Sequence, residues 1–182
     1  MKLWEFAVLA GIAASPLQAK DHAHPSGNLQ SDAIDMPLSV TIRQYDRWRI
    51  EQSSAFVAAL TTNPAGSLFG LLCGTTCSYY VNVNRACEVG VTYPGLLSGA
   101  NGTLGVTLRC LHVKEEGEEY AVLLIDEDVT DALGDADDVS IVVPVTGGQF
   151  SVARFSMAGG TEALDDMLDM VDEQPGSSNF TL

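Results

Sequence analysis

Apolar and polar residues alternate along three short segments of the chain. The segments are 38–42, 79–83 and 106–110, and in each of them every second residue is aliphatic, aromatic or cysteine. Side chains of a β-strand point alternately to its two faces. Each segment is therefore predicted to be a strand that buries one face.

Four other segments are short apolar runs with little polar interruption. They are 56–60, 68–73, 120–125 and 141–145. Runs of this length are typical of strands that are covered on both faces. The run 141–145 also begins a predicted hairpin over 141–155, because Gly147 and Gly148 can adopt the positive φ angles of a tight turn.

Turn-forming residues recur at short intervals between these segments. The predicted turns are at 63–66, 74–76, 93–95, 98–102, 115–117 and 146–148. Short strands separated by such turns indicate an antiparallel sandwich or barrel-like domain rather than a series of βαβ units. We expect an all-β or β-rich α+β fold with a single domain over residues 38–174.

One amphipathic helix is predicted near the C-terminus, over residues 161–173. Thr161 is the expected N-cap, and Leu164, Met167, Leu168 and Val171 form one apolar stripe at helical spacing. The helix should therefore lie against the sheet. Pro175-Gly176 should end it, and residues 175–182 are expected to form a disordered tail.

The N-terminal residues have the pattern of a secretory signal peptide. Lys2 precedes an apolar stretch over 6–14, and Ala19 is a small residue at the expected cleavage position. This assigns residues 1–19 to a signal peptide and the polar residues 20–37 to a flexible leader. The chain is expected to be periplasmic or secreted, with no membrane span, because the apolar stretch is too short to cross a bilayer.

The formal net charge of −15 narrows the range of partners. An acidic surface repels nucleic acid and anionic membranes, so we expect neither as a partner. Another envelope or extracellular protein is the expected partner. The densest acidic run, over 126–138, is predicted to be a solvated loop with a short helical turn through Val129 and Leu133, and the alternative is a cation site.

The four cysteines, Cys73, Cys77, Cys87 and Cys110, are an even number in a chain with an export pattern. Two disulfides are the expected state in an oxidising compartment. The sequence allows three connectivities, of which we favour Cys73–Cys77 across a tight turn and Cys87–Cys110 between strands. A zinc site formed by the cysteines with His112 is the alternative, although the ligand spacing fits it poorly.

A second metal hypothesis concerns the start of the mature chain. Cleavage after Ala19 would expose Lys20-Asp21-His22, and an amine with a histidine in third place binds Cu(II) or Ni(II) in a square-planar arrangement of nitrogens. Lys20, Asp21 and His22 are therefore the candidate metal residues, and copper or nickel the candidate cofactor.

The segment Gln149–Leu164 resembles the end of invasion-associated locus B proteins. In that family a strand with a Phe/Leu-Ser-Leu pattern continues through glycine into a helix that contains Ala-Leu. The export pattern and the two cysteine-bearing segments are also similar. The resemblance implies an exported bacterial β-sandwich protein whose function is not enzymatic.

Catalytic motifs give no support to an enzyme, so no catalytic residue is assigned. The sequence has no G-x-S-x-G motif, and His112 is the only histidine within 38–174. The favoured function is that of an exported binding or accessory protein that contacts another protein. The alternatives are a small hydrolase that uses two carboxylates and copper or nickel binding through Lys20-Asp21-His22.

Overall fold

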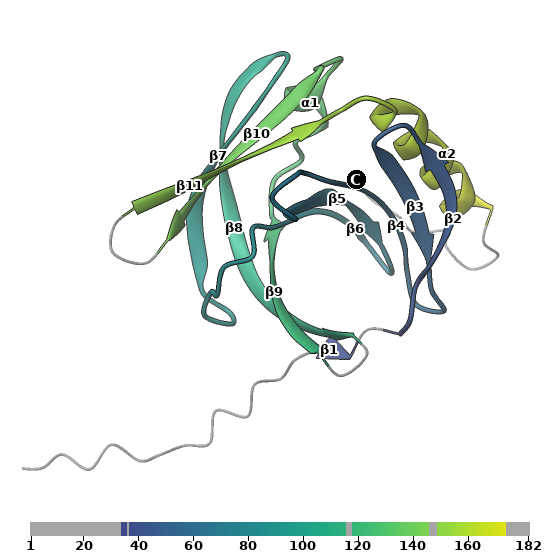
Figure 1. Ribbon diagram of the computed structural model, residues 1–182, viewed down its shortest axis with the longest axis horizontal. Helices are drawn as coiled ribbons and strands as arrows, with labels where there is room; N and C mark the ends of the chain where they lie inside the picture. The colour runs from purple at the N-terminus through teal and green to yellow at the C-terminus, as the bar shows by residue number, and fades with distance from the viewer. Residues whose placement is uncertain (1–33, 36, 116–117, 146–148, 174–182) are drawn as a thin grey trace, which may run out of the picture. The chain divides into compact units, whose positions relative to one another are not determined.

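Strands dominate the computed structural model, which describes residues 34–35, 37–115, 118–145 and 149–173. One sheet contains all the strands (Figure 1). In chain order they are β1 (Ile34–Asp35), β2 (Val40–Tyr45), β3 (Trp48–Gln52), β4 (Val57–Thr62), β5 (Leu68–Cys73), β6 (Cys77–Asn82), β7 (Thr92–Gly99), β8 (Gly102–Glu115), β9 (Glu118–Ile125), β10 (Asp138–Val145) and β11 (Gln149–Ser156). The helices are α1 (Thr130–Leu133) and α2 (Gly160–Asp172).

The order of strands in the sheet is β11-β10-β7-β8-β9-β6-β5-β4-β3-β2, and each neighbouring pair is antiparallel. Strand β1 is off this path and pairs in parallel with β8 at Val113 and Lys114. The sheet is curled into a half-barrel, which confirms the predicted antiparallel, barrel-like class with a C-terminal helix.

Strand β8 belongs to both halves of the curled sheet. Its first part, up to Arg109, pairs with β7, whereas its second part, from Leu108 onward, pairs with β9. Beyond Arg109, β8 no longer pairs with β7, and at Val113 and Lys114 it pairs with β1 instead. The long strand therefore joins the β7-β10-β11 part of the sheet to the part that runs from β9 to β2.

The main core lies between these two parts and under α2. It contains Trp48 and Ile50 of β3, the alternate residues of β4 to β6, and the inward residues of β7 to β11. Phe69 is its centre, because its ring contacts those of Trp48, Tyr79 and Phe155 at centroid distances of 6.2, 6.0 and 5.5 Å. Such contacts between rings add to the free energy of burial.

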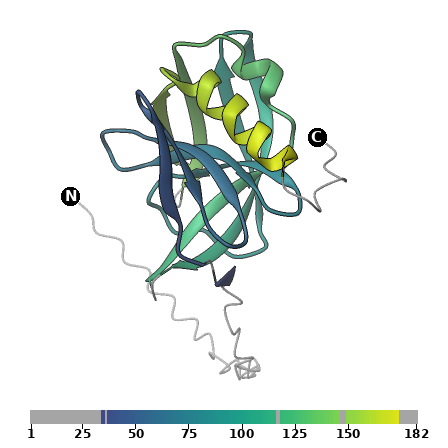
Figure 2. The same cartoon turned by 90° about the vertical axis from the view of Figure 1, so that its right-hand side faces the viewer.

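Helix α2 covers the main core from one side and lies across β2, β3 and β4 (Figure 2). Of the predicted apolar stripe, Met167 and Val171 are buried, and Leu164 and Leu168 pack against the core while partly buried. Ala163, which was not in the predicted stripe, is buried as well. The start of the helix differs from the prediction: the N-cap is Gly159, two residues before Thr161. Gly159 has a φ of 79°, and a Cβ there would lie 2.3 Å from the carbonyl oxygen of Tyr45, so only glycine fits this reversal.

Most predicted strands and the hairpin are confirmed. Residues 138–145 and 149–156 pair in register, although the turn glycines Gly147 and Gly148 lie outside the described residues. The predicted strand at 38–42 differs, because β2 starts at Val40 and its apolar side chains stay exposed. Leu38 is 64% and Val40 63% exposed, since β2 is an edge strand and none of the described elements packs over this end.

Two further predictions need correction. The predicted turn at 93–95 lies inside β7, where Pro94 stands before the stretch that pairs with β10, so its missing N–H breaks no ladder bond on that side. The predicted flexible leader includes Ile34 and Asp35, which form β1. A two-residue strand is too short to have a periodic pattern, so the alternation of apolar and polar residues could not indicate it.

Candidate functional site

A cavity of about 450 Å³ opens on the face of β3–β6 that turns away from the main core. Strands β1, β3, β4, β5, β6, β8 and β9 all contribute side chains to it. Figure 1 shows how the sheet curves from β8 and β9 to β3. We call this cavity the cup. Its apolar lining is Ile34, Phe56, Ala58, Leu60, Leu68, Leu72, Tyr80, Leu111, Val113, Tyr120, Val122 and Leu124.

The cup exists because the middle strands are apolar on both faces. On β4, Val57 and Ala59 point into the main core, whereas Ala58 and Leu60 belong to a second apolar cluster with Tyr80, Val113 and Val122. The prediction that 56–60 is covered on both sides is thus confirmed for Val57–Leu60, which are all buried.

Small residues on the floor leave the space. Ala58 stands opposite Leu72, which in turn stands opposite Ser78, and Gly70 stands between Leu60 and Tyr80. The space beside Gly70 is occupied, because a Cβ there would lie 2.3 Å from the carbonyl oxygen of Ala59 and 2.8 Å from Cβ of Leu60. The cavity beside Ala58, Leu72 and Ser78 has the size that small-molecule sites have, about 300–1,000 Å³.

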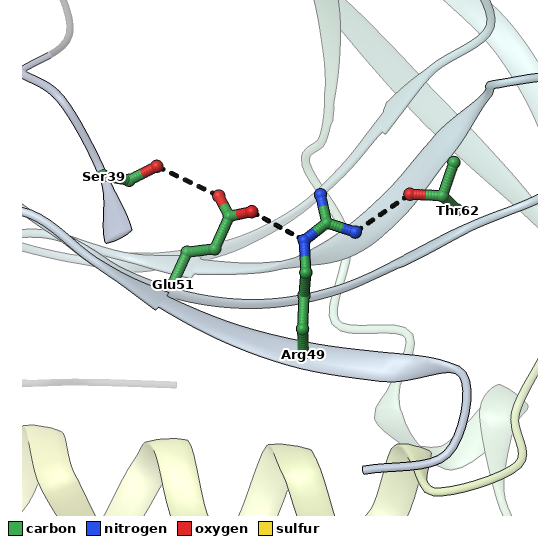
Figure 3. A network of polar contacts seen from close by, with 4 residues as sticks. All are labelled: Ser39, Arg49, Glu51 and Thr62. Atoms are coloured by element: carbon green, nitrogen blue, oxygen red, sulfur yellow. Dashed lines mark hydrogen bonds and ion pairs between the residues drawn. The ribbon is translucent and has the colours of Figure 1, made fainter. Parts of the chain in front are cut away.

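One charged pair lies on the wall of this apolar cavity (Figure 3). Arg49 donates from Nε to Oε1 of Glu51 at 2.6 Å and from Nη1 to Oγ1 of Thr62 at 3.0 Å. Ser39 donates its hydroxyl to Oε2 of Glu51 at 3.1 Å. Both side chains of the pair are partly buried, at 28% and 21% exposure, so water screens the pair less than it screens a fully exposed one.

The two ends of the cup are held by other means. The Cys73–Cys77 disulfide closes the turn between β5 and β6, and Thr75 and Thr76 of that turn line the cavity. On the opposite side, Ile34 of β1 lines the cavity. Strand β1 pairs with β8, whereas β2, the next strand in the chain, pairs with β3. The segment between them therefore links the two edges of this part of the sheet.

The second disulfide, Cys87–Cys110, lies outside the cup, on β8. Both pairings are the ones that the spacing favours. His112 is held at the same place: Nδ1 lies 2.5 Å from Oε1 of Glu119, and Nε2 lies 3.2 Å from the carbonyl oxygen of Cys87. All four sulfur atoms are in disulfides, so none is a thiolate that could bind zinc with His112.

A second cavity, of about 480 Å³, lies between α2 and the acidic segment 126–135. Three of the carboxylates that line it have hydrogen-bond partners within the protein. Asp126 accepts two hydrogen bonds from Arg109, Glu127 accepts the N–H of Thr107 at 2.6 Å, and Asp128 accepts the N–H of Thr130 at 2.9 Å. In the described part of the chain, no three metal-ligating residues come together, and the predicted helical turn is α1.

The carboxylate hydrolase gains no support from these groups. A general acid needs a raised pKa. The pKa values of Asp128 and Asp166 are lowered from their ordinary value, which is the opposite direction. Hydrogen bonds from Thr130 lower the first, and those from Tyr45 and Arg43 lower the second.

The candidate metal residues Lys20, Asp21 and His22 lie outside the described residues, as do the signal-peptide segment 1–19 and the tail 175–182. Copper or nickel binding stays a prediction. Among the described residues, no helix is long and apolar enough to span a membrane.

Sequence reasoning missed Arg49, Glu51 and Ala58. A signal for the first two was present, because Arg49 and Glu51 alternate with Trp48 and Ile50 on β3 and so must share the face opposite the main core. No comparable signal existed for Ala58, since a small apolar residue in a buried strand is compatible with a filled core or with a hollow.

Comparison of the chain with known protein families, with curated proteins and with solved structures gives no match. The cup and its chemistry are therefore the basis for a functional proposal. The two disulfides suggest an oxidising, extracellular or periplasmic environment.

Proposed function

We propose that the protein is an exported, non-enzymatic binding protein that holds an apolar ligand in the cup. The observation that carries this proposal is the 450 Å³ cavity on the second face of β3–β6, whose lining is mostly aliphatic and aromatic. Apolar surface in contact with water is unfavourable by about 25 cal/mol per Å², and a bound apolar group would remove it from water.

The compartment part of the proposal has two supports. The first is the pair of disulfides, and the second is the signal-peptide pattern of residues 1–19. The Cys73–Cys77 disulfide is stable in a compartment without cellular reductants. There it fixes one end of the cup covalently.

The test is the binding of a fluorescent apolar probe, N-phenyl-1-naphthylamine, to the purified protein. We expect saturable binding to the wild type and loss of binding in Ala58→Leu, whose new side chain fills the cup. Ala65→Leu is the matched control, because it adds the same atoms at an exposed turn position. Equal binding by Ala58→Leu and the wild type would refute the proposal.

A second candidate function follows from the edge of the sheet. Leu38, just before β2, and Val40 and Ile42 of β2 are exposed, and β2 has no strand on its outer side in the described part of the chain. An exposed apolar edge is a template for pairing with a strand of another protein. In this second candidate function, the partner is the one expected from the sequence, which is another envelope or extracellular protein.

The edge hypothesis is tested by a pull-down from envelope extract with the wild type and with Val40→Lys. A charged side chain at an edge strand disfavours strand addition. We expect a partner that the wild type retains and Val40→Lys loses. An extract that yields no retained protein at several salt concentrations would count against this candidate and leave the cup proposal as it stands.

A further inference from the structure

The polar group on the wall of the cup indicates which kind of apolar ligand fits, an inference that depends on the proposed binding function. An arginine has five N–H donors. Nε and Nη1 of Arg49 bond to Glu51 and Thr62, and among the described residues Nη2 has no acceptor (Figure 3). The guanidinium therefore has donors to spare at the cavity wall.

Glu51 differs from Arg49, because both of its carboxylate oxygens already have a hydrogen-bond partner. One oxygen accepts from Arg49 and the other from Ser39. The pair thus offers a ligand N–H donors more readily than acceptors. The complementary group on a ligand is an oxygen that accepts, such as the oxygen of a carbonyl or a carboxylate.

Charge distinguishes between these two acceptors. The positive charge of Arg49 is already matched by Glu51 at 2.6 Å, so a bound carboxylate would place a second negative charge beside the pair in a partly buried site. The chain as a whole has a net charge of −15, which also repels an anion. A neutral carbonyl satisfies the donors without either cost.

The cavity volume sets the size of the apolar part. A methylene group is similar in size to a water molecule, whose share of liquid volume is about 30 Å³. A cavity of about 450 Å³ therefore accommodates roughly fifteen such groups, which is one acyl chain of medium length. The lining contains aliphatic side chains from β4, β5, β8 and β9, which suit a flexible chain.

We infer that the cup binds a single acyl chain that ends in a neutral ester or amide, whose carbonyl oxygen accepts a hydrogen bond from Arg49. The chain lies along the apolar floor between β4 and β9, and the remainder of the head group points to the opening. Glu51 orients the guanidinium through its bond to Nε and keeps the site electrically neutral.

The experiment measures the affinity of three probes with the same twelve-carbon chain and different head groups. They are 1-monolauroylglycerol, which has a neutral ester, laurate, which is an anion, and dodecyltrimethylammonium, which is a cation without an acceptor. Each displaces N-phenyl-1-naphthylamine from the full chain below its micelle concentration. We expect the ester to bind at least about tenfold more tightly than either charged probe.

Variants at Arg49 test the role of its donors. Arg49→Met should weaken binding of the ester by about tenfold. It also leaves Glu51 without its counter-ion, so it should weaken binding of laurate and strengthen binding of the cation. Arg49→Lys keeps the charge beside Glu51 with fewer, differently placed donors, and it should give an intermediate loss if Arg49→Met does not fold. Arg109→Met is the matched control, because Arg109 forms an ion pair with Asp126 outside the cup.

The results distinguish the inference about the ligand from the proposed binding function of the cup. Displacement of the dye by all three probes with equal affinity, tighter binding of laurate, or unchanged ester binding in both Arg49 variants would overturn this inference while the cup remains a binding site. Failure of the dye itself to bind would refute the proposed function. Preference for the ester that is lost in the Arg49 variants and kept in Arg109→Met supports the inference.

Discussion

The two faces of the β3–β6 layer are made by the same strands, and they are packed in different ways. On one face, Trp48 and Phe69 are completely buried in the main core under α2, and the second cavity lies farther along this face, next to Leu71 and Tyr79. On the other face, side chains that are equally apolar surround a cavity. The difference teaches that apolar character does not by itself fill a core: the shape and size of the facing residues decide it.

The reason lies in what covers each face. The main core is covered by α2 and by β7, β10 and β11, and their side chains interdigitate with those of the layer. The cup is surrounded by strands at its sides, β8, β9, β1 and β3, but in the described part of the chain no helix lies over its floor. A covered face gains packing contacts, whereas an open face retains room for a ligand.

The largest expected effect comes from truncating one residue on each face of the same strand, β5. Phe69→Ala should lower the free energy of unfolding by about 3–5 kcal/mol, because it leaves a hole between three aromatic rings. Leu72→Ala, on the cup face, should cost only about 1 kcal/mol, since part of its surface already adjoins empty space. Urea denaturation measures both. Similar losses would show that the two faces are packed alike.

The disulfides give the next effect. Cys87→Ala with Cys110→Ala opens a loop with a sequence separation of 23 and should cost about 3 kcal/mol. Cys73→Ala with Cys77→Ala opens a loop with a separation of 4 and should cost about 2 kcal/mol. Only the second change should also weaken probe binding, because the turn that it loosens lines the cup. Unfolding and probe titration of both double variants check this, and loss of probe binding in the first alone would contradict it.

The smallest expected effect is a dependence of the main-core face on pH. Tyr45 donates to Asp166 of α2 at 2.7 Å, and Arg43 forms an ion pair with it. These bonds lower the pKa of Asp166 below its ordinary value of 3.8, with the Tyr45 hydroxyl as the largest cause. A lowered pKa stabilises the folded state above about pH 4, and this stabilisation is lost as the pH falls through the folded pKa.

Melting temperatures at pH 5 and pH 3 measure this contribution. The wild type should lose more than Asp166→Asn, which has no carboxyl group at this position to protonate. Asp169→Asn removes the same charge from an exposed position of α2 and serves as the control for net charge. Equal acid losses in Asp166→Asn and the wild type would mean that the Tyr45–Asp166 contact contributes nothing to holding the helix.

Much of the fold could be predicted because it depends on local patterns. The alternation at 79–83 and 106–110 and the helical stripe from Leu164 to Val171 each predict an element on their own, and the cysteine spacing favours one of three disulfide connectivities. The exceptions have non-local causes. Pro94 and Gly95 resemble a turn, but Gly95 lies in a strand where a Cβ would lie 2.7 Å from a methyl carbon of Leu108.

The cup could not be predicted for a related reason. A period of two shows that Ala58 and Ala59 face opposite sides, yet it does not show which side is filled. That depends on the path of the whole sheet, in which β8 changes its neighbour from β7 to β9 near Arg109. The resemblance of 149–164 to invasion-associated locus B proteins concerns β11 and α2, on the main-core side, and stays a prediction.

Adjacent alanines on β4 provide the most direct test of the difference between the faces. Ala58 is 1% exposed and borders the cup, whereas Ala59 is 0% exposed and lies in the main core. Measured by urea denaturation, Ala59→Leu should lose about 1–3 kcal/mol of unfolding free energy through overpacking, and Ala58→Leu should lose less than about 0.5 kcal/mol or gain stability. A loss at Ala58 as large as the loss at Ala59 would contradict the account, because the floor of the cup would then have no room for a ligand.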